Sequence, residues 1–477
     1  MAYNGFEQER NSFPLSVGSQ NNQPQEPRQQ VSIATILKGQ NATSTLVVIA
    51  AFVVMFTSCG LNFAFGVYQE LYESMSSSPD PNPFTNASPA LISLIGTLAL
   101  SSMSLGAPFA SAWSKSYSPR TIILMGGLIF ALSNVLASFC YKFWQFLLTQ
   151  GMLLGIGTCM TYIPAVTVAP GWFTTHRGLA VGVLSSGTGV GGLVWAPVLR
   201  TLNTNIGFRN TLRLTGAVSL LPLAFSAMIL KWEPEIERRN NVELQSSRSR
   251  FLVQLIDWRV ARSRKFVAQL LSAALQASAY YAPLYFLSAY GRTLGYSAAE
   301  GAKYIALSNA SSAVSKIVIG WTADRVGRLN VLLFTTFISA VTVFGLWLPS
   351  MLFGIDQNGR PLFVAFTILF GIFAGAYISL FPTTLVELFG VQHFASVNGF
   401  LYMARGAAAL VGVPTAGALI RGDYGSEEVR TSQAYFQTSS IIGSLLVGTT
   451  LGVAWVRIEA SLGMTGRPEE RTRRWRA

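Results

Sequence analysis

The sequence predicts an all-α membrane protein with twelve transmembrane helices in two six-helix pseudo-repeats. Only 12% of the residues are charged, about half the share of a typical soluble domain, and the mean hydropathy is +0.41. The apolar residues come in long blocks, as a bilayer span of roughly 20 apolar residues requires. A charged linker separates the first six blocks from the last six.

The blocks are expected to be helices, because a backbone in hydrocarbon must satisfy its hydrogen bonds internally. The first six cover residues 45–70, 91–113, 121–140, 143–170, 178–198 and 214–230. The last six cover residues 266–290, 301–321, 331–351, 361–386, 394–420 and 434–456. Six helices, a linker and six more helices is the plan of two parallel repeats. The chain is therefore predicted to have five parts: a disordered cytoplasmic N-tail (1–44), an N-terminal bundle (45–230), a basic cytoplasmic linker (231–265), a C-terminal bundle (266–457) and a basic cytoplasmic C-tail (458–477).

Charge and composition argue against several other classes of protein. The net charge of +13 would suit a nucleic-acid-binding protein, but most basic residues lie between or beyond the apolar blocks, so we expect no nucleic-acid partner. The three cysteines lie in or beside apolar blocks, which is typical of packing thiols. The sequence has no CxxC or HExxH motif, no nucleophile elbow and no paired buried carboxylates, so we expect no metal, no cofactor and no enzyme activity. No cleavable signal peptide is visible.

The distribution of lysine and arginine predicts the orientation. With the N-terminus in the cytoplasm, the inner segments hold 23 of the 34 basic residues and the outer loops hold 8. We therefore expect a multi-pass protein of the plasma membrane with both termini cytoplasmic; a vacuolar or other internal membrane is the alternative. The loop after the first block contains Asn86-Ala87-Ser88, a glycosylation sequon on the predicted outer side.

The loop after the eighth block carries a specific motif, Gly320-Trp-Thr-Ala-Asp324-Arg325-Val-Gly327-Arg328. It resembles the G-x-x-x-D-R-x-G-R signature of the major facilitator superfamily, which implies that family's fold and a gating role for the loop. Asp324 can accept hydrogen bonds from a helix N-terminus or pair with a cation. A purely topological charge cluster is the alternative, but topology alone would not need the aspartate.

The equivalent loop of the first half is degenerate. Residues 111–120 keep the closing Pro119-Arg120 but have neither the acid nor the glycines. We therefore expect the inner gate of the first half to be weaker than that of the second.

Further motifs resemble the fungal branch of the monocarboxylate-transporter-like porters. The match lies in the W-F-x-x-x-R-x-x-A and S-G-x-x-x-G-G patterns that begin at Trp172 and Ser186, and in Phe65-Gly66-Val67-Tyr68-Gln69. The resemblance spans all twelve blocks and implies a secondary transporter. Gly187 and Gly191 form a small-xxx-small face, which either lets the two halves slide past one another or packs two helices statically.

Three cations, Lys303, Lys316 and Arg405, lie inside predicted helices, where an ionisable residue is a functional candidate by default. Lys303 is within a turn of the outer end and is expected to snorkel to the membrane surface. Arg405 is near the middle of the eleventh block, where it either lines the cavity and attracts an anionic or polar substrate or binds neighbouring carbonyl groups. Lys316 lies where the family resemblance implies a cavity-facing basic residue that holds a substrate carboxylate. Snorkelling to the membrane surface is the alternative for Lys316.

The predicted cavity also contains polar and aromatic candidates. Together with Arg405 and Lys316, we assign as substrate-binding candidates Asn62, Tyr162, Gln276, Tyr280, Tyr281, Asn309 and Tyr402. Such a lining suits a larger, partly apolar organic molecule, and ordinary helix packing is the alternative for each residue. Proton coupling is open, because no carboxylate lies deep in a predicted helix and Ser312 stands where animal monocarboxylate carriers have an aspartate.

The sequence therefore predicts a monomeric secondary-active transporter that works by alternating access in a lipid bilayer. Its expected substrate is a small organic anion or a related metabolite. Efflux of a fungal secondary metabolite is the alternative direction of transport. A receptor or transceptor that binds its ligand without moving it is the alternative from another class.

Overall fold

The computed structural model describes residues 33–76, 78, 80–85, 87, 89–173, 176–246, 258–354, 358–420 and 432–462. It divides into two compact units, Met1–Ala42 and Thr43–Ala477, with the boundary inside the first helix. All packing described below lies within the second unit. The described residues form helices and turns and no strand, so the predicted all-α class is confirmed.

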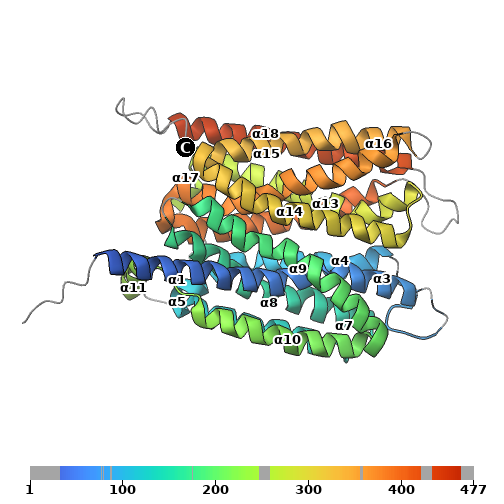
Figure 1. Ribbon diagram of the computed structural model, residues 1–477, viewed down its shortest axis with the longest axis horizontal. Helices are drawn as coiled ribbons and strands as arrows, with labels where there is room; N and C mark the ends of the chain where they lie inside the picture. The colour runs from blue at the N-terminus through green and yellow to red at the C-terminus, as the bar shows by residue number, and fades with distance from the viewer. Residues whose placement is uncertain are drawn as a thin grey trace, which may run out of the picture. The chain divides into compact units, whose positions relative to one another are not determined.

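The N-terminal half consists of helices α1 to α10 (Figure 1). Their bounds are α1 Ile33–Val54, α2 Gly60–Phe63, α3 Phe65–Ser76, α4 Pro89–Leu105, α5 Ala107–Tyr117, α6 Pro119–Ala137, α7 Phe143–Phe146, α8 Leu154–Val168, α9 Arg177–Ile206 and α10 Phe208–Ile229. The π-helical segments Met55–Cys59 and Leu147–Leu153 join α1 to α2 and α7 to α8. Residues 33–44, which the sequence predicts to be part of the disordered tail, are helical and form the first part of α1.

The linker and the C-terminal half comprise helices α11 to α18. Their bounds are α11 Pro234–Ser246, α12 Trp258–Ala261, α13 Arg264–Thr293, α14 Ala298–Val326, α15 Arg328–Thr342, α16 Leu348–Phe353, α17 Gly359–Ala418 and α18 Phe436–Leu462. A π-helical segment, Val343–Trp347, joins α15 to α16. Helix α17 is two helices joined at Gly390, whose φ of 76° and ψ of 161° are not helical.

Eight helices among the described residues are long and apolar enough to cross a membrane, and the bent pair Leu91–Leu105 and Ala107–Tyr117 would make a ninth. Helix α17 is counted once among these eight, but its break at Gly390 divides it into two helices, which adds one more crossing. Helices α13 and α14, with 30 and 29 residues, are as long as the others but more polar. The twelve predicted blocks thus all fall on helices.

Two equivalent turns reveal the repeat. Gly327 joins α14 to α15 with φ 106° and ψ 129°, and Ser118 joins α5 to α6 with φ 93° and ψ 141°. A positive φ suits glycine because it has no Cβ. The second half meets this requirement with the glycine of the Asp324 motif, whereas the first half holds a serine in the same strained conformation.

The apolar core has three main parts. One cluster belongs to the N-terminal half and includes Tyr72 and Leu212, and another belongs to the C-terminal half and includes Trp347 and Phe363. The largest cluster is shared, because it contains Leu184 of α9 together with residues of α17. The functional candidates of both halves lie around this shared core.

Candidate functional site

Helices α9 and α14 pack side by side and form the most extensive contact between the two halves (Figure 1). A Cβ at Gly178 would collide with the Gly320 carbonyl oxygen, and a Cβ at Gly182 with that of Lys316. Farther along, a Cβ at Gly189 would lie 2.7 Å from the Asn309 carbonyl oxygen. Small residues are needed here because two backbones approach closely.

The same arrangement recurs where the second part of α17 crosses α4 and α5. Gly399 faces Ala107 and Pro108, and Gly406 faces Ser101 and Ser104. Gly399 and Gly406 are seven residues apart, as Gly182 and Gly189 are on α9. Each half thus supplies one glycine-bearing helix to the interface.

Gly187 and Gly191 do not lie in this interface. A Cβ at Gly187 would lie 2.6 Å from the Phe52 carbonyl oxygen, and one at Gly191 would lie 2.7 Å from the Gly60 Cα. Both glycines therefore pack α9 against the first span within the N-terminal half. Of the two interpretations, static close packing describes them, and the contact between the halves uses Gly178, Gly182 and Gly189 instead.

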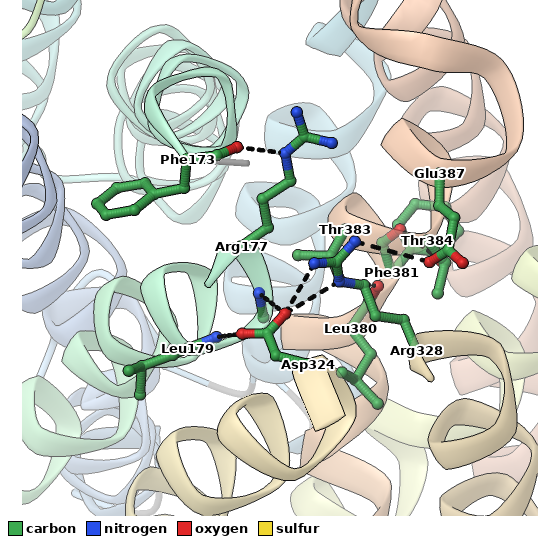
Figure 2. A network of polar contacts seen from close by, with 11 residues as sticks. Phe173, Arg177, Leu179, Asp324, Arg328, Leu380, Phe381, Thr383, Thr384 and Glu387 are labelled. Carbon is green, nitrogen blue, oxygen red and sulfur yellow. Dashed lines mark hydrogen bonds and ion pairs between the residues drawn. The ribbon is translucent and has the colours of Figure 1, made fainter. Parts of the chain in front are cut away.

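Asp324 joins the two halves at one end of the bundle, which we call the Asp324 end. Its carboxylate accepts hydrogen bonds from the backbone N–H groups of Gly178 and Leu179, both at 2.8 Å. These donors lie in the first turn of α9, where backbone N–H groups have no partner within the helix and the helix dipole favours an anion. Figure 2 shows the carboxylate directed at this helix start.

Arg328 completes the network within the C-terminal half. Its Nε and Nη2 donate to Asp324 Oδ1 at 3.1 and 2.8 Å, and its Nη1 lies 3.7 Å from Glu387 of α17 (Figure 2). The Asp324 and Arg328 side chains are only 5% and 13% exposed, so water screens their interaction weakly. Arg325 of the same motif instead stacks over the Trp321 ring at 3.6 Å.

Lys316 lies deeper in the same interface. Its Nζ donates to the Thr188 hydroxyl at 2.9 Å and lies 3.4 Å from the Ser185 carbonyl oxygen, both on α9. The side chain is 3% exposed and crosses to the other half. Lys316 therefore does not snorkel in this conformation; it bridges the halves.

Arg405 is buried inside a cage of aromatic rings on α17. Its guanidinium lies 5.3, 5.0 and 5.7 Å from the ring centres of Tyr377, Phe381 and Tyr402. The residue is 4% exposed, and its Nη1 has no hydrogen-bond partner among the described residues. The groups with which it interacts electrostatically are tyrosines, including Tyr281. The missing partner makes Arg405 a candidate for binding an anion.

Tyr162 and Tyr402 meet beside this cage. Their hydroxyl oxygens are 3.0 Å apart, and the contact joins α8 of one half to α17 of the other. Since the Tyr402 ring also faces Arg405, the tyrosine pair connects the candidate anion site with the contact between the halves.

The other predicted candidates are spread over both halves. Asn62 donates to Thr158 at 2.8 Å and borders a small pocket within the N-terminal half. Tyr280 packs on Tyr281 and Phe370 in the C-terminal core. Gln276 is buried and its Oε1 has no partner among the described residues, and the half-buried Asn309 lies against α9.

Two further predictions concern glycosylation and metal binding. Asn86, the predicted glycosylation site, lies outside the described residues. Among the described residues, no group of three or more histidine, cysteine or acidic side chains could hold a metal ion.

Sequence reasoning missed several residues of the interface. Gly178, Gly182, Ser185 and Gly189 recur at spacings of four, three and four, a helical stripe of small residues that could have identified the face of α9 toward α14. No local signal identified Tyr377 and Phe381 as the cage of Arg405, because both lie on a different helical segment from Arg405.

Comparisons with known proteins agree with this architecture. The family model of the Major Facilitator Superfamily matches residues 45–413. An MFS-type transporter of Gibberella moniliformis is 27% identical over 411 residues, which are 86% of this chain and 91% of the relative. The agnestins efflux protein of Paecilomyces divaricatus is 26% identical over 376 residues, or 79% and 80% of the two chains.

A solved structure shares the fold. The proton:xylose symporter XylE, bound to 6-bromo-6-deoxy-D-glucose, superposes with a TM-score of 0.66 at 14% identity, covering 86% of this chain and 95% of that one. With the match of the family model over most of the chain, the predicted major facilitator fold is confirmed. The chain belongs to the Major Facilitator Superfamily of transporters.

Proposed function

We propose that this transporter moves a small organic anion or a related metabolite across a membrane by alternating access, with Arg405 as the residue that binds the anionic group. The observation that carries the proposal is the buried guanidinium with an unpartnered Nη1. A buried charge needs a partner to offset its desolvation, and an aromatic cage supplies only part of that. A carboxylate on the substrate would complete the coordination.

The contacts between the halves support alternating access. The Asp324 network, the Lys316 bridge and the tyrosine pair all cross between the halves, and each can break without unfolding either half. They hold the bundle shut at the Asp324 end. Opening of that end would require the three contacts to part together.

Orientation and location form a further part of the proposal. We assign the Asp324 end, the basic linker and both chain termini to the cytoplasm, on the distribution of lysine and arginine. The plasma membrane is the proposed location, with an internal membrane as the alternative. The protein acts as a monomer with the bilayer and a small-molecule substrate as its partners.

Efflux of a secondary metabolite is the second candidate function. It is favoured by one relative whose name states efflux of agnestins. The solved structure of XylE is described as that of a proton:xylose symporter. Proton coupling in this chain would have to work without a carboxylate deep in the described membrane helices.

Binding to matched ligand pairs tests the anion assignment. The purified full-length protein is screened by thermal shift against benzoate with benzamide and phthalate with phthalamide. A ligand that binds only the folded state raises the melting temperature. The carboxylates are expected to stabilise the protein and the amides are not, and Arg405→Gln is expected to abolish the difference.

The control variant is Lys303→Gln, which removes an exposed lysine of α14 and should leave the response intact. Equal stabilisation by acids and amides, or an unchanged response in Arg405→Gln, would contradict the assignment. Counterflow of radiolabelled phthalate in proteoliposomes then separates a transporter from a receptor, because a receptor binds without flux.

A further inference from the structure

Unpartnered polar atoms form two parallel rows on α13 and α17. On α13 they are Nε2 and Oε1 of Gln269 and Oε1 of Gln276, and on α17 they are Oδ1 of Asn398 and Nη1 of Arg405. All four side chains are at most 4% exposed. The two members of each row are seven residues apart, which is two turns of the same helix face, or about 10.5 Å.

The two rows lie at matching heights, because the helices run side by side in the same direction. The rings of Phe266 and Phe400 are 5.7 Å apart, and Ser278 donates to the Ala408 carbonyl oxygen at 3.0 Å. Gln276 and Arg405 thus form an upper level. Gln269 and Asn398 form a lower level, nearer the Asp324 end.

The lower level borders the closed contact between the halves. Asn398 Nδ2 lies 3.5 Å from the Thr167 hydroxyl of α8, across the interface. Phe266 and Ala273, one turn on either side of Gln269, belong to the apolar cluster that both halves share. Neither amide atom of Gln269 nor the Oδ1 of Asn398 has a hydrogen-bond partner among the described residues. Buried polar atoms without a partner destabilise the closed conformation. Opening of the interface would let these atoms gain hydrogen bonds, at the loss of the long Asn398–Thr167 bond.

We infer that Gln269 and Asn398 form a second polar station for the transported molecule, between Arg405 and the Asp324 end, which becomes accessible when that end opens. The inference rests on the proposed function. Neutral amides can donate to and accept from a carboxylate, hydroxyl or carbonyl group without a charge. They would hold such a group more weakly than Arg405 does, and a weak station favours release toward the Asp324 end.

A labelling experiment tests the station without any substrate. The background is the full-length chain with Cys59→Ala, Cys140→Ala and Cys159→Ala, which removes its three buried thiols. Single cysteines are introduced as Gln269→Cys or Asn398→Cys, with and without Asp324→Ala to weaken the closed end. Their reaction with a water-soluble maleimide is expected to be at least about ten-fold faster with Asp324→Ala, a gain of roughly 1.4 kcal/mol in the opening equilibrium.

Two further positions serve as controls. Ala268→Cys lies next to Gln269 but packs with Leu329, Val456 and Ala460 inside the C-terminal half, so it should stay unreactive. Ser111→Cys lies against Gly399 across the interface and reports the opening itself. Reaction at position 111 without reaction at 269 and 398 would overturn the inference.

Side-specific kinetics provide the second test. In oriented proteoliposomes, Gln269→Leu and Asn398→Leu are expected to raise the KM for radiolabelled phthalate about five-fold from the Asp324 side only. Ser339→Ala, which alters a buried serine of α15 bonded to the Thr335 carbonyl of the same helix, should change neither KM. No change, or an equal change on both sides, contradicts the station. Absence of any protein-dependent phthalate flux would contradict the proposed function instead. In that case the maleimide experiment, which needs no substrate, still tests whether Gln269 and Asn398 become accessible.

Discussion

The ammonium group of Lys316 on α14 donates a hydrogen bond to the Thr188 hydroxyl on α9 at 2.9 Å, and this bond joins the two halves deep inside the bundle. Lys316 is 3% exposed and Thr188 6%. The bond is charge-assisted and shielded from water, which strengthens it. It belongs to the closed conformation and breaks when α9 and α14 separate.

A double-mutant cycle measures this bond. Lys316→Met and Thr188→Val each remove one partner, and we expect a coupling energy of about 1–2 kcal/mol between them in the free energy of unfolding. Lys316→Met should also speed maleimide reaction at Ser111→Cys, because the halves part more easily. Strictly additive effects of the two substitutions would mean that the bond does not hold the halves together.

Neutralising Asp324 should weaken the closed end. Asp324→Asn loses the charge that attracts the α9 helix start and Arg328, and the expected loss of stability is roughly 2 kcal/mol. Glu235→Gln is the matched control, since its ion pair with Arg239 is exposed and contributes under about 1 kcal/mol. Thermal unfolding in detergent compares the two, and equal melting temperatures would refute the role of Asp324 in closure.

A methyl group at Gly182 should keep the halves apart. Gly182→Ala places a Cβ against the Lys316 carbonyl oxygen, so α9 and α14 must separate. We expect destabilisation by about 1–3 kcal/mol and slower transport in counterflow. Gly66→Ala has open space around the added Cβ and should show no loss of either. Normal flux in Gly182→Ala would show that such close contact is dispensable.

The strained serine between α5 and α6 offers a stabilising substitution. Ser118 has a φ of 93°, and glycine at this position should relieve strain of about 1 kcal/mol. The Ser118 hydroxyl accepts only a long hydrogen bond from the Arg120 N–H at 3.3 Å, so little is lost. We expect a higher melting temperature for Ser118→Gly and a lower one for the reverse change, Gly327→Ser. A drop in the first variant would indicate that the serine has another role.

Particular elements show how far the sequence could predict the fold. The block at residues 178–198 corresponds to α9, Arg177–Ile206, and the block at 266–290 to α13, Arg264–Thr293. The helices extend past the apolar blocks because helical hydrogen bonding continues into the polar interface. The bend of 47° between α4 and α5 was not predicted, because Gly106 permits it without a change in hydropathy.

The candidate site was predicted less completely than the fold. Arg405, Lys316 and the Asp324 motif were identified because a charge inside an apolar block stands out in one dimension. Their partners were not, since Thr188, Tyr377 and the first N–H groups of α9 are ordinary residues of their own helices. The direction in which Gly187 faces was also undecidable, because α9 is glycine-rich on several sides.

The sequence by itself determined which segments enter the bilayer, the repeat of six helices and the location of the isolated charges, since each depends on the polarity of residues along the chain. Tertiary structure alone decided which helix faces meet, and hence that Lys316 bridges the halves while Arg405 is enclosed by aromatic rings. The physical reason is that contacts between helices depend on rotation and crossing, which short-range hydrophobic patterns do not fix when nearly every face of a helix is apolar.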